Sequence, residues 1–274
     1  MPGSFSGYRN LLHYPSEHWR PPFYYRPHGR LQKLKTFFYQ FFDLQAGTIY
    51  LHLSACLPTV EGDVLDVGCG IQPYRHLFPP EARYKGLDTI DSKKKFGYAA
   101  PDTVYFSGKK WPQKDRSVDF ILCTETLEHV PDTKTFLREA YRCLRPGGTV
   151  LFTIPFEARW HFIPYDYWRF TPSGLELIFG QAGFSSIKVF GRGNQLTVVC
   201  YKAMAFVWSL LNPLPSNFFL RATCRIIGCL SLPLFFGAVL LANLTLWREG
   251  RVESLGYTLL AQRPGRGAAQ GGRA

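Results

Sequence analysis

The sequence predicts an α/β fold in which helices cover both faces of a mainly parallel β-sheet. Val64 to Gly70, VLDVGCG, joins apolar residues suited to a buried strand to a glycine turn. A second such segment, Tyr84 to Asp88, also ends in an acid. Beyond these, segments of strand character alternate with segments of helical spacing. This alternation is typical of a doubly wound sheet with right-handed crossovers.

The N-terminal part is expected to form an arm followed by a helix. Residues 1–28 are rich in aromatic, proline and basic residues, which excludes a regular helix and suggests a lid over the site or an arm on the domain. Between Leu31 and Leu57 an amphipathic helix is expected, because apolar residues recur at helical spacing. We interpret its apolar face as packing on the sheet. That face comprises Leu31, Leu34, Phe37, Phe38, Phe41 and Phe42.

The elements of the sheet are expected in regular order. Strands are predicted near 63–67, 84–88, 103–106, 118–123, 148–154, 186–190 and 255–261, and helices near 73–79, 132–144 and 173–182.

A hydrophobic insertion is predicted between the last two strands. Residues 203–220 are apolar apart from Asn, Ser and Pro, and residues 226–247 carry no charge, a length sufficient to span a bilayer. Both flanking strands must return to one sheet, so we expect a membrane hairpin or interfacial helices rather than a single span. Carrying Arg221 and Arg225 across would cost about 2.5 to 3.5 kcal/mol each, which favours partial insertion. The alternative is a packed helical cap or a dimer interface.

Composition places the chain in a reducing compartment. The seven cysteines are odd in number and show no paired spacing, which argues against a disulfide-rich secreted protein. Residues 1–20 contain no apolar run typical of a secretory signal, so the catalytic domain is expected to face the cytosol. The net charge of +12 permits affinity for nucleic acid, anionic lipid or phosphorylated substrates and selects none of them.

Taken together, these motifs resemble those of the class I S-adenosylmethionine-dependent methyltransferases of the type 11-like kind. The first motif of that family has the form VLDVGCG, and its second strand ends in an acid. Asp119 to Asp132 is similar to its fourth strand and following loop, and Leu144 to Phe152 to its glycine turn and fifth strand. Pro164 to Pro172 is similar to a stretch of a bacterial-type subgroup. The resemblance covers about residues 60–192 and the last strand.

The resemblance implies a Rossmann-like, seven-stranded methyltransferase sheet whose last strand is antiparallel. We therefore expect four regions. They are an N-terminal arm and amphipathic helix at 1–58, the S-adenosylmethionine-binding domain at 59–202 and 250–263, the hydrophobic insertion at 203–249, and a disordered tail at 264–274.

Family position also implies which residues bind the cofactor. Asp66, Gly68 and Gly70 would surround its methionine part, Asp88 its ribose, and Thr124 with Glu125 its sulfonium end. The acid that often follows the third strand is absent, and Trp111, which stands near that position, is interpreted as a packing residue.

Glu125, Glu128 and His129 are the catalytic candidates. On a helical turn their spacing would place them on one face, where they could converge on a divalent ion. The pattern resembles that of ubiquinone-biosynthesis O-methyltransferases and small-RNA 2′-O-methyltransferases, and by that resemblance His161 is a fourth candidate ligand. Without a metal, His129 would hydrogen-bond near the acceptor or act as a general base.

The segment Trp160 to Arg169 is expected to lie over the acceptor side of the pocket. Its aromatic residues could stack on a ring or sugar. Arg169 would pair either with a phosphate or with Asp166, which would brace the loop.

The sequence therefore favours a methyltransferase at the cytoplasmic face of a membrane. Its acceptor would be an oxygen or nitrogen of a lipid, an isoprenoid or a lipid-linked glycan. The alternatives are an RNA 2′-O-methyltransferase, which would bind nucleic acid, and a non-catalytic membrane or assembly subunit. The acceptor, the methylated atom and the oligomeric state stay open.

Overall fold

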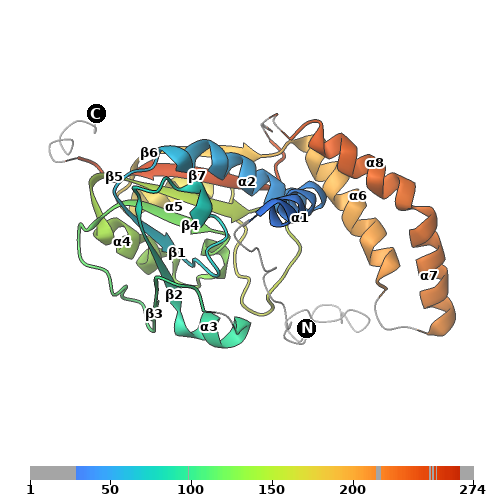
Figure 1. Cartoon of the computed structure of the whole chain (residues 1–274), viewed down its shortest axis with the longest axis horizontal. Coiled ribbons are helices and arrows are strands. Elements are labelled where there is room, and N and C mark those ends of the chain that lie inside the picture. Colours follow the sequence, from blue (N-terminus) through green and yellow to red (C-terminus); the bar gives the residue numbers. More distant parts are fainter. Residues whose placement is uncertain are drawn as a thin grey trace, which may run out of the picture.

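One mixed sheet organises the molecule, a computed structural model that describes residues 29–97, 99–213, 217–246, 248, 250 and 252–265. Within that part, seven strands lie in the order β3-β2-β1-β4-β5-β7-β6 (Figure 1). All neighbours are parallel except β7, which is antiparallel to β5 and β6. The predicted doubly wound sheet with an antiparallel last strand is confirmed. The strands are β1 Asp63–Val67, β2 Arg83–Thr89, β3 Thr103–Phe106, β4 Val118–Thr124, β5 Leu144–Pro155, β6 Ser185–Arg192 and β7 Gly256–Gln262.

Helices cover both faces of the sheet because strand side chains alternate between them. In β4, Ile121 and Cys123 pack in one core cluster with α4 (Thr133–Cys143) and α5 (Pro172–Gln181). Phe120 and Leu122 pack in the other cluster, with α2 (Leu44–Cys56) and the short helix η2 (Leu57–Thr59). The carboxyl ends of β1, β2 and β4 consequently share one edge, where the candidate site lies.

The segment between β1 and β2 contradicts the helix expected at residues 73–79. Only a single 3-10 turn forms there, η3 (Arg75–Leu77). Pro73 and the prolines at 79 and 80 bracket this short segment, and proline restricts the residue before it and lacks the N–H that a helix needs.

The segment between β2 and β3 forms a helix that was not expected. Helix α3 (Ile90–Phe96) is N-capped by Thr89, whose hydroxyl accepts from the Ser92 N–H. It ends at Gly97 in the left-handed conformation.

The N-terminal helical region is divided in two. Helix α1 (Gly29–Phe42) ends at Asp43, whose carboxylate accepts from the Ala46 N–H and N-caps α2. The expectation that the apolar face of 31–42 packs on the sheet is wrong, because α1 has no buried residue. Ile49 and Leu53 of α2 pack against the sheet instead. Helical spacing reveals that an apolar face exists but not what covers it.

Between β6 and β7, the residues that the structure describes form three helices that extend away from the sheet, here called the arm (Figure 1). They are α6 (Gln195–Leu211), α7 (Phe218–Leu230) and α8 (Leu232–Asn243). Cys200 and Met204 of α6 pack with Ala238 and Val239 of α8. In the described part of the chain, no single helix is long and apolar enough to cross a membrane. Helices α7 and α8 meet the length and composition criteria only as a pair, bent by 48°.

Candidate active site

A cavity of about 370 Å³ opens at the carboxyl ends of β1, β2, β4 and β5. Its walls come from the glycine turn after β1, the ends of β2 and β4, the start of α2, the loop after β5, and α6. The lining residues are Asp43, Gln45, Ala46, Ile49, Gly68, Cys69, Gly70, Ile71, Pro73, Tyr74, Asp88, Ser92, Phe96, Thr124, Glu125, Thr126, His129, Pro155, Ala158, Arg159, His161, Phe162 and Tyr201.

The glycine turn after β1 forms the floor of the cavity. Gly68 has a φ of 69°, and a Cβ there would lie 2.3 Å from Thr126 Oγ1, so only glycine allows this close approach. The Gly70 N–H donates to Asp88 Oδ2 at 3.0 Å. This bond joins the turn to the end of β2.

Asp88 presents a nearly buried carboxylate to the cavity. Its other oxygen, Oδ1, accepts from the Thr89 N–H at 2.7 Å. Burial raises the pKa of Asp88, while the bonds from Thr89 and Gly70 oppose the rise. Gly68, Gly70, Asp88 and Thr124, predicted cofactor contacts, all line the cavity.

Asp66 lies under the turn and does not line the cavity. Its carboxylate accepts from the Tyr84 hydroxyl, and its Oδ1 has no hydrogen-bond partner. Burial raises its pKa to about 7. In the structure Asp66 is thus joined to Tyr84 of β2, and its contact with the cofactor stays a prediction.

Glu125 is held by a buried arginine. Its φ is 45°, and its N–H donates to Thr153 O at 2.9 Å. Arg192, the last residue of β6, is fully buried and donates to Glu125 Oε1 at 2.9 Å and to Ile154 O at 3.2 Å. Glu125 therefore lines the cavity as half of an ion pair.

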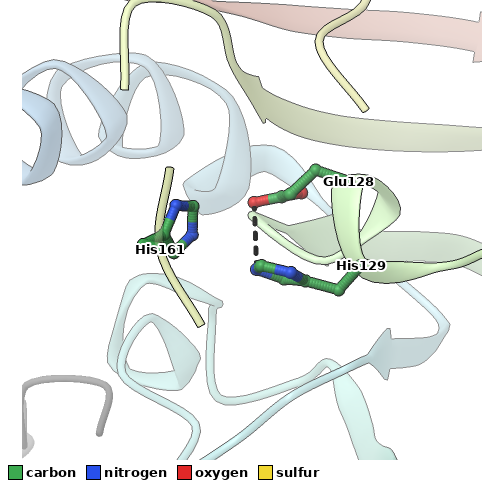
Figure 2. A group of neighbouring side chains, drawn as sticks. All are labelled: Glu128, His129 and His161. Carbon is green, nitrogen blue, oxygen red and sulfur yellow. Dashed lines mark ion pairs between the residues drawn. The ribbon is translucent and has the colours of Figure 1, made fainter. Parts of the chain in front are cut away.

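Glu128, His129 and His161 lie close together (Figure 2); His129 and His161 line the cavity, whereas Glu128 is fully buried and does not. One ligand atom from each lies within 4.8 Å of the others, and His129 Nε2 is 3.6 Å from Glu128 Oε1. The expected convergence of Glu125 on this group does not occur, because Glu125 pairs with Arg192 and the turn is the 3-10 helix η4 (Leu127–His129).

The protonation states of this group follow from burial. Glu128 is fully buried without a hydrogen-bond partner for either oxygen, and burial and the Glu125 charge raise its pKa well above the usual range. Burial lowers the pKa of His129 to about 4, so its imidazole is neutral near pH 7. Its Nδ1 lies 2.9 Å from Tyr165 O. A proton on Nδ1 satisfies that carbonyl and leaves the Nε2 lone pair facing Glu128.

The loop after β5 closes the acceptor side. Asp166 accepts from both terminal nitrogens of Arg169, at 2.6 and 2.7 Å, which makes the pair an internal brace. His161 Nδ1 is 3.1 Å from Asp166 Oδ2. Phe162 of this loop contacts Phe96 of α3, with ring centroids 5.1 Å apart. Trp111 packs in the core, as predicted, and does not line the cavity.

Arg192 and Tyr201 are site residues that sequence reasoning missed. Arg192 contacts a residue 67 positions away, so no local pattern indicates its partner. The only local indication is that a charged residue stands at the end of a segment whose other residues suit a strand. Tyr201 lies just before the expected hydrophobic insertion, and its neighbours in the sequence give no indication that its side chain lines a cavity.

Comparison with known proteins identifies the family. A model of the methyltransferase domain matches residues 44–189, just over half of the chain. The chain belongs to the S-adenosylmethionine-dependent methyltransferases. A probable S-adenosylmethionine-dependent methyltransferase of Mycolicibacterium smegmatis is 33% identical over 97 residues, which cover 34% of this chain and 38% of that protein.

Two further methyltransferases are similar over comparable segments. The demethylmenaquinone methyltransferase of Listeria monocytogenes is 31% identical over 98 residues, covering 31% of this chain and 41% of the relative. The fatty-acid O-methyltransferase of Mycolicibacterium smegmatis is 33% identical over 112 residues, covering 37% and 40%. The matched segment thus spans about two fifths of each of these methyltransferases.

Solved methyltransferase structures share the fold. A possible histamine N-methyltransferase of Thermotoga maritima has a TM-score of 0.50 at 17% identity, over 85% of this chain and 96% of that one. A S-adenosylmethionine-dependent methyltransferase of Archaeoglobus fulgidus has a TM-score of 0.50 at 18% identity, over 83% and 99%.

The cavity fits the cofactor of this methyltransferase family. The glycine turn leaves its backbone open to a ligand, and Asp88 offers a carboxylate at the end of the adjacent strand, where a ribose is held in dinucleotide folds.

Proposed function

We propose that the protein transfers a methyl group from S-adenosylmethionine to an oxygen or nitrogen of a lipid, an isoprenoid or a lipid-linked glycan, at the cytoplasmic face of a membrane. One observation carries the proposal: Tyr201 of α6 lines the cavity, while the same helix continues into the apolar arm. Val199, Phe206 and Trp208 of α6 are exposed, so an apolar surface begins beside the acceptor side.

The chemistry requires alignment more than acid or base strength. S-adenosylmethionine supplies an electrophilic methyl group on a sulfonium. Asp88 would hold the ribose hydroxyls, and Thr124 and Glu125, which also line the cavity, would lie at the sulfonium end. As the acceptor forms its bond to the methyl carbon, the methyl–sulfur bond would break and leave a neutral thioether, and the acceptor would lose one proton. The neutral His129 would accept that proton at Nε2.

Cofactor binding is tested by calorimetry on the detergent-solubilised full chain. Wild type is expected to bind S-adenosylmethionine. Asp88→Ala should bind more weakly by about 1.5 to 3 kcal/mol, because a charge-assisted contact is lost. Asp91→Ala is a matched control, since Asp91 is an exposed acid just beyond it in α3 and does not line the cavity. No binding by wild type, or equal binding by a folded Asp88→Ala, contradicts the cofactor assignment.

The acceptor class is tested with methyl-labelled S-adenosylmethionine. Wild type is incubated separately with total membrane lipid and with total RNA. Label is expected in the organic phase, and His129→Ala should abolish it while leaving cofactor affinity within a few-fold. Label in RNA alone would instead favour the RNA 2′-O-methyltransferase.

Membrane association is tested by flotation with liposomes. The full chain is compared with a variant in which residues 203–247 are replaced by a short Gly/Ser linker. Wild type is expected to float and the variant to remain at the bottom while still binding S-adenosylmethionine. A monomeric wild type that stays with the aqueous fraction without detergent defeats this part of the proposal.

A divalent cation at Glu128, His129 and His161 is an alternative form of the proposal, in which His129 Nε2 would bind the ion instead of accepting the proton. Two imidazoles and a carboxylate are a suitable donor set for a divalent transition metal, and the buried Glu128 carboxylate has no other partner. Such an ion would orient an acceptor hydroxyl or amine.

The cation is tested with Mn²⁺ by electron paramagnetic resonance, which measures free Mn²⁺ without any turnover. Wild type and the control Asp91→Asn, which alters an exposed acid outside the cavity, should bind Mn²⁺ equally, and Glu128→Gln and His161→Gln should not. Equal binding by wild type and a cooperatively unfolding Glu128→Gln rules out the metal.

A further inference from the structure

Helix α1 presents its apolar face to solvent. Leu31, Leu34, Phe37, Phe38 and Phe42 are 67%, 51%, 57%, 49% and 38% exposed. At 100° per residue they fall, with Phe41, within a sector of about 140°, which also contains the exposed Arg30 of the first turn. A helix of a globular domain normally buries such a face.

The polar side of α1 faces the protein instead. Gln32, Thr36, Tyr39 and Gln40 lie on the opposite side of the helix and are partly buried. The helix is seated closely on α2, because a Cβ added to Gly47 would lie 2.6 Å from the Gln40 carbonyl oxygen. Its orientation is therefore fixed by contacts, with the amphipathic pattern reversed.

Helix α1 is also joined to the arm. The Phe42 ring stacks on Phe235 and meets Phe236 edge to face, with centroids 6.5 and 6.2 Å apart. Asn243 Nδ2 donates to Phe41 O at 2.9 Å. The exposed face of α1 thus adjoins the exposed apolar residues of α8.

Two lysines flank the apolar sector of α1. Lys33 lies about 40° before Phe37 and Lys35 about 20° beyond Phe42. Both lysines are exposed, and α1 contains no acidic residue. An apolar face bordered by lysines suits the boundary between acyl chains and anionic headgroups, where the lysine stems lie along the apolar region and their ammonium groups reach phosphates.

We infer that α1 lies in the plane of an anionic membrane surface, with its apolar face at the acyl boundary and Lys33 and Lys35 among the headgroups. This inference rests on the proposed function and adds to it. The arm supplies apolar attachment, whereas α1 selects anionic lipid. Because α1 leads into α2, whose first residues line the cavity, the helix also sets the acceptor side near the headgroups.

The occupant is a lipid surface rather than a second copy of the chain. Two copies meeting through α1 would bring the four lysines of the two helices together without an acidic partner on either helix. An anionic surface neutralises the same charges.

The test is flotation of the full chain with two kinds of vesicle, pure phosphatidylcholine and phosphatidylcholine with 30% phosphatidylglycerol (about one lipid in three, enough to give an anionic surface). Wild type is expected to bind the anionic vesicles more tightly, with an advantage that falls as salt is raised. Lys33→Gln/Lys35→Gln should reduce affinity for anionic vesicles on the order of 30-fold, at about 1 kcal/mol per lysine, and leave binding to neutral vesicles unchanged. Lys114→Gln/Lys134→Gln, which alters two exposed lysines on and near α4, is the matched control and should behave as wild type.

The outcomes separate this inference from the membrane proposal. Equal flotation of wild type with both vesicles, or an unchanged Lys33→Gln/Lys35→Gln, overturns the role of α1 and leaves the arm as the anchor. If wild type binds neither vesicle, both proposals fail. Loss of a wild-type dimer in Phe37→Ser/Phe38→Ser, without any change in flotation, would show that α1 binds a second copy instead.

Discussion

Arg192, Asp66 and Glu128 are buried near the cavity and differ in how their charges are compensated. Arg192 pairs with Glu125, whereas Asp66 and Glu128 each retain at least one buried oxygen without a partner. Burial raises the pKa of both carboxyls. Near neutral pH the two uncompensated acids therefore tend to hold protons.

Asp66 is expected to make stability fall as pH rises. Its folded pKa of about 7 lies above the unfolded value of 3.8, so between these values the folded state holds a proton that the unfolded state has lost. The contribution is complete below about pH 4 and is lost as pH rises through about 7. From pH 5 to pH 7, the free energy of unfolding of wild type should fall by roughly 2 kcal/mol relative to Asp66→Asn. Urea unfolding of both proteins at the two pH values measures this, and parallel pH profiles would refute it.

The effects of substituting Arg192 and Glu125 on the free energy of unfolding are expected to be strongly coupled. Removing Arg192 alone leaves a carboxylate facing an apolar space, and removing either partner of a buried pair costs about 3 to 5 kcal/mol. Arg192→Met should thus be strongly destabilising, and Arg192→Met/Glu125→Gln much less so than the sum of the single changes. A double-mutant cycle by chemical unfolding measures the coupling. Additive effects would mean that the pair does not constrain Glu125.

Residue patterns predicted the part of the site that depends on the local chain. Gly68, Gly70 and Asp88 were found because a strand, a turn and an acid follow one another in sequence. The partner of Glu125 was not found, because the ion pair depends on how β6 is placed beside β7 and β5. A lone arginine gives no indication of that placement.

At the scale of elements, close contact between α6 and α7 depends on one glycine. A Cβ at Gly228 of α7 would lie 2.9 Å from Leu211 Cδ2 and 3.0 Å from the Leu211 backbone nitrogen. In the chain, α6 ends at Leu211 and α7 begins at Phe218, so a short segment connects the two helices. The shape of the distal end of the arm therefore depends on this contact.

Two glycine substitutions are expected to act in opposite directions. Gly237 of α8 is exposed and has no atom within 4 Å of an added Cβ, so Gly237→Ala should stabilise the helix by about 0.5 to 1 kcal/mol. Gly228→Ala gains the same propensity but forces α6 and α7 apart. Limited proteolysis in detergent should show faster cleavage in the arm for Gly228→Ala and slower cleavage for Gly237→Ala. Equal protection of both variants would mean that α7 does not pack on α6.

The elements themselves were predictable where the hydrophobic period was clear. All seven strands lie near their expected positions because buried strands read as apolar runs. Helix α3 was missed because its seven residues include three consecutive lysines and give no apolar period. The predicted orientation of α1 was wrong. The spacing of its apolar residues is the same whether the apolar face packs on a sheet or faces solvent.

For the molecule as a whole, apolar surface is concentrated on one side. Helices α6, α7 and α8 of the arm carry exposed large apolar side chains, and so does α1, which lies beside the base of the arm. The arm projects from the sheet domain (Figure 1). Monomeric proteins in water rarely expose so many large apolar side chains on neighbouring helices.

Without detergent or lipid, the chain is expected to associate through this surface. Light scattering after size-exclusion chromatography should show a mass that rises with concentration in buffer and becomes that of one chain, corrected for bound detergent, above the critical micelle concentration. The variant with residues 203–247 replaced should associate less in buffer. A concentration-independent monomer of the full chain in buffer would show that the apolar surface is tolerated in water.

The position of β7 gives the arm a property that its length alone would not suggest. The chain leaves the sheet at Arg192 and returns at Leu255, where the Leu255 N–H donates to Arg192 O at 2.9 Å; nearby, the Gly250 N–H donates to Gly193 O at 2.8 Å. The two ends of the arm are therefore clasped together by the backbone, whatever lies between them. Closing a longer or shorter loop across a fixed gap changes the entropy only slowly with length. The part of the arm beyond Tyr201, which lines the cavity, can accordingly become longer or shorter with little change in the entropy of closing the loop.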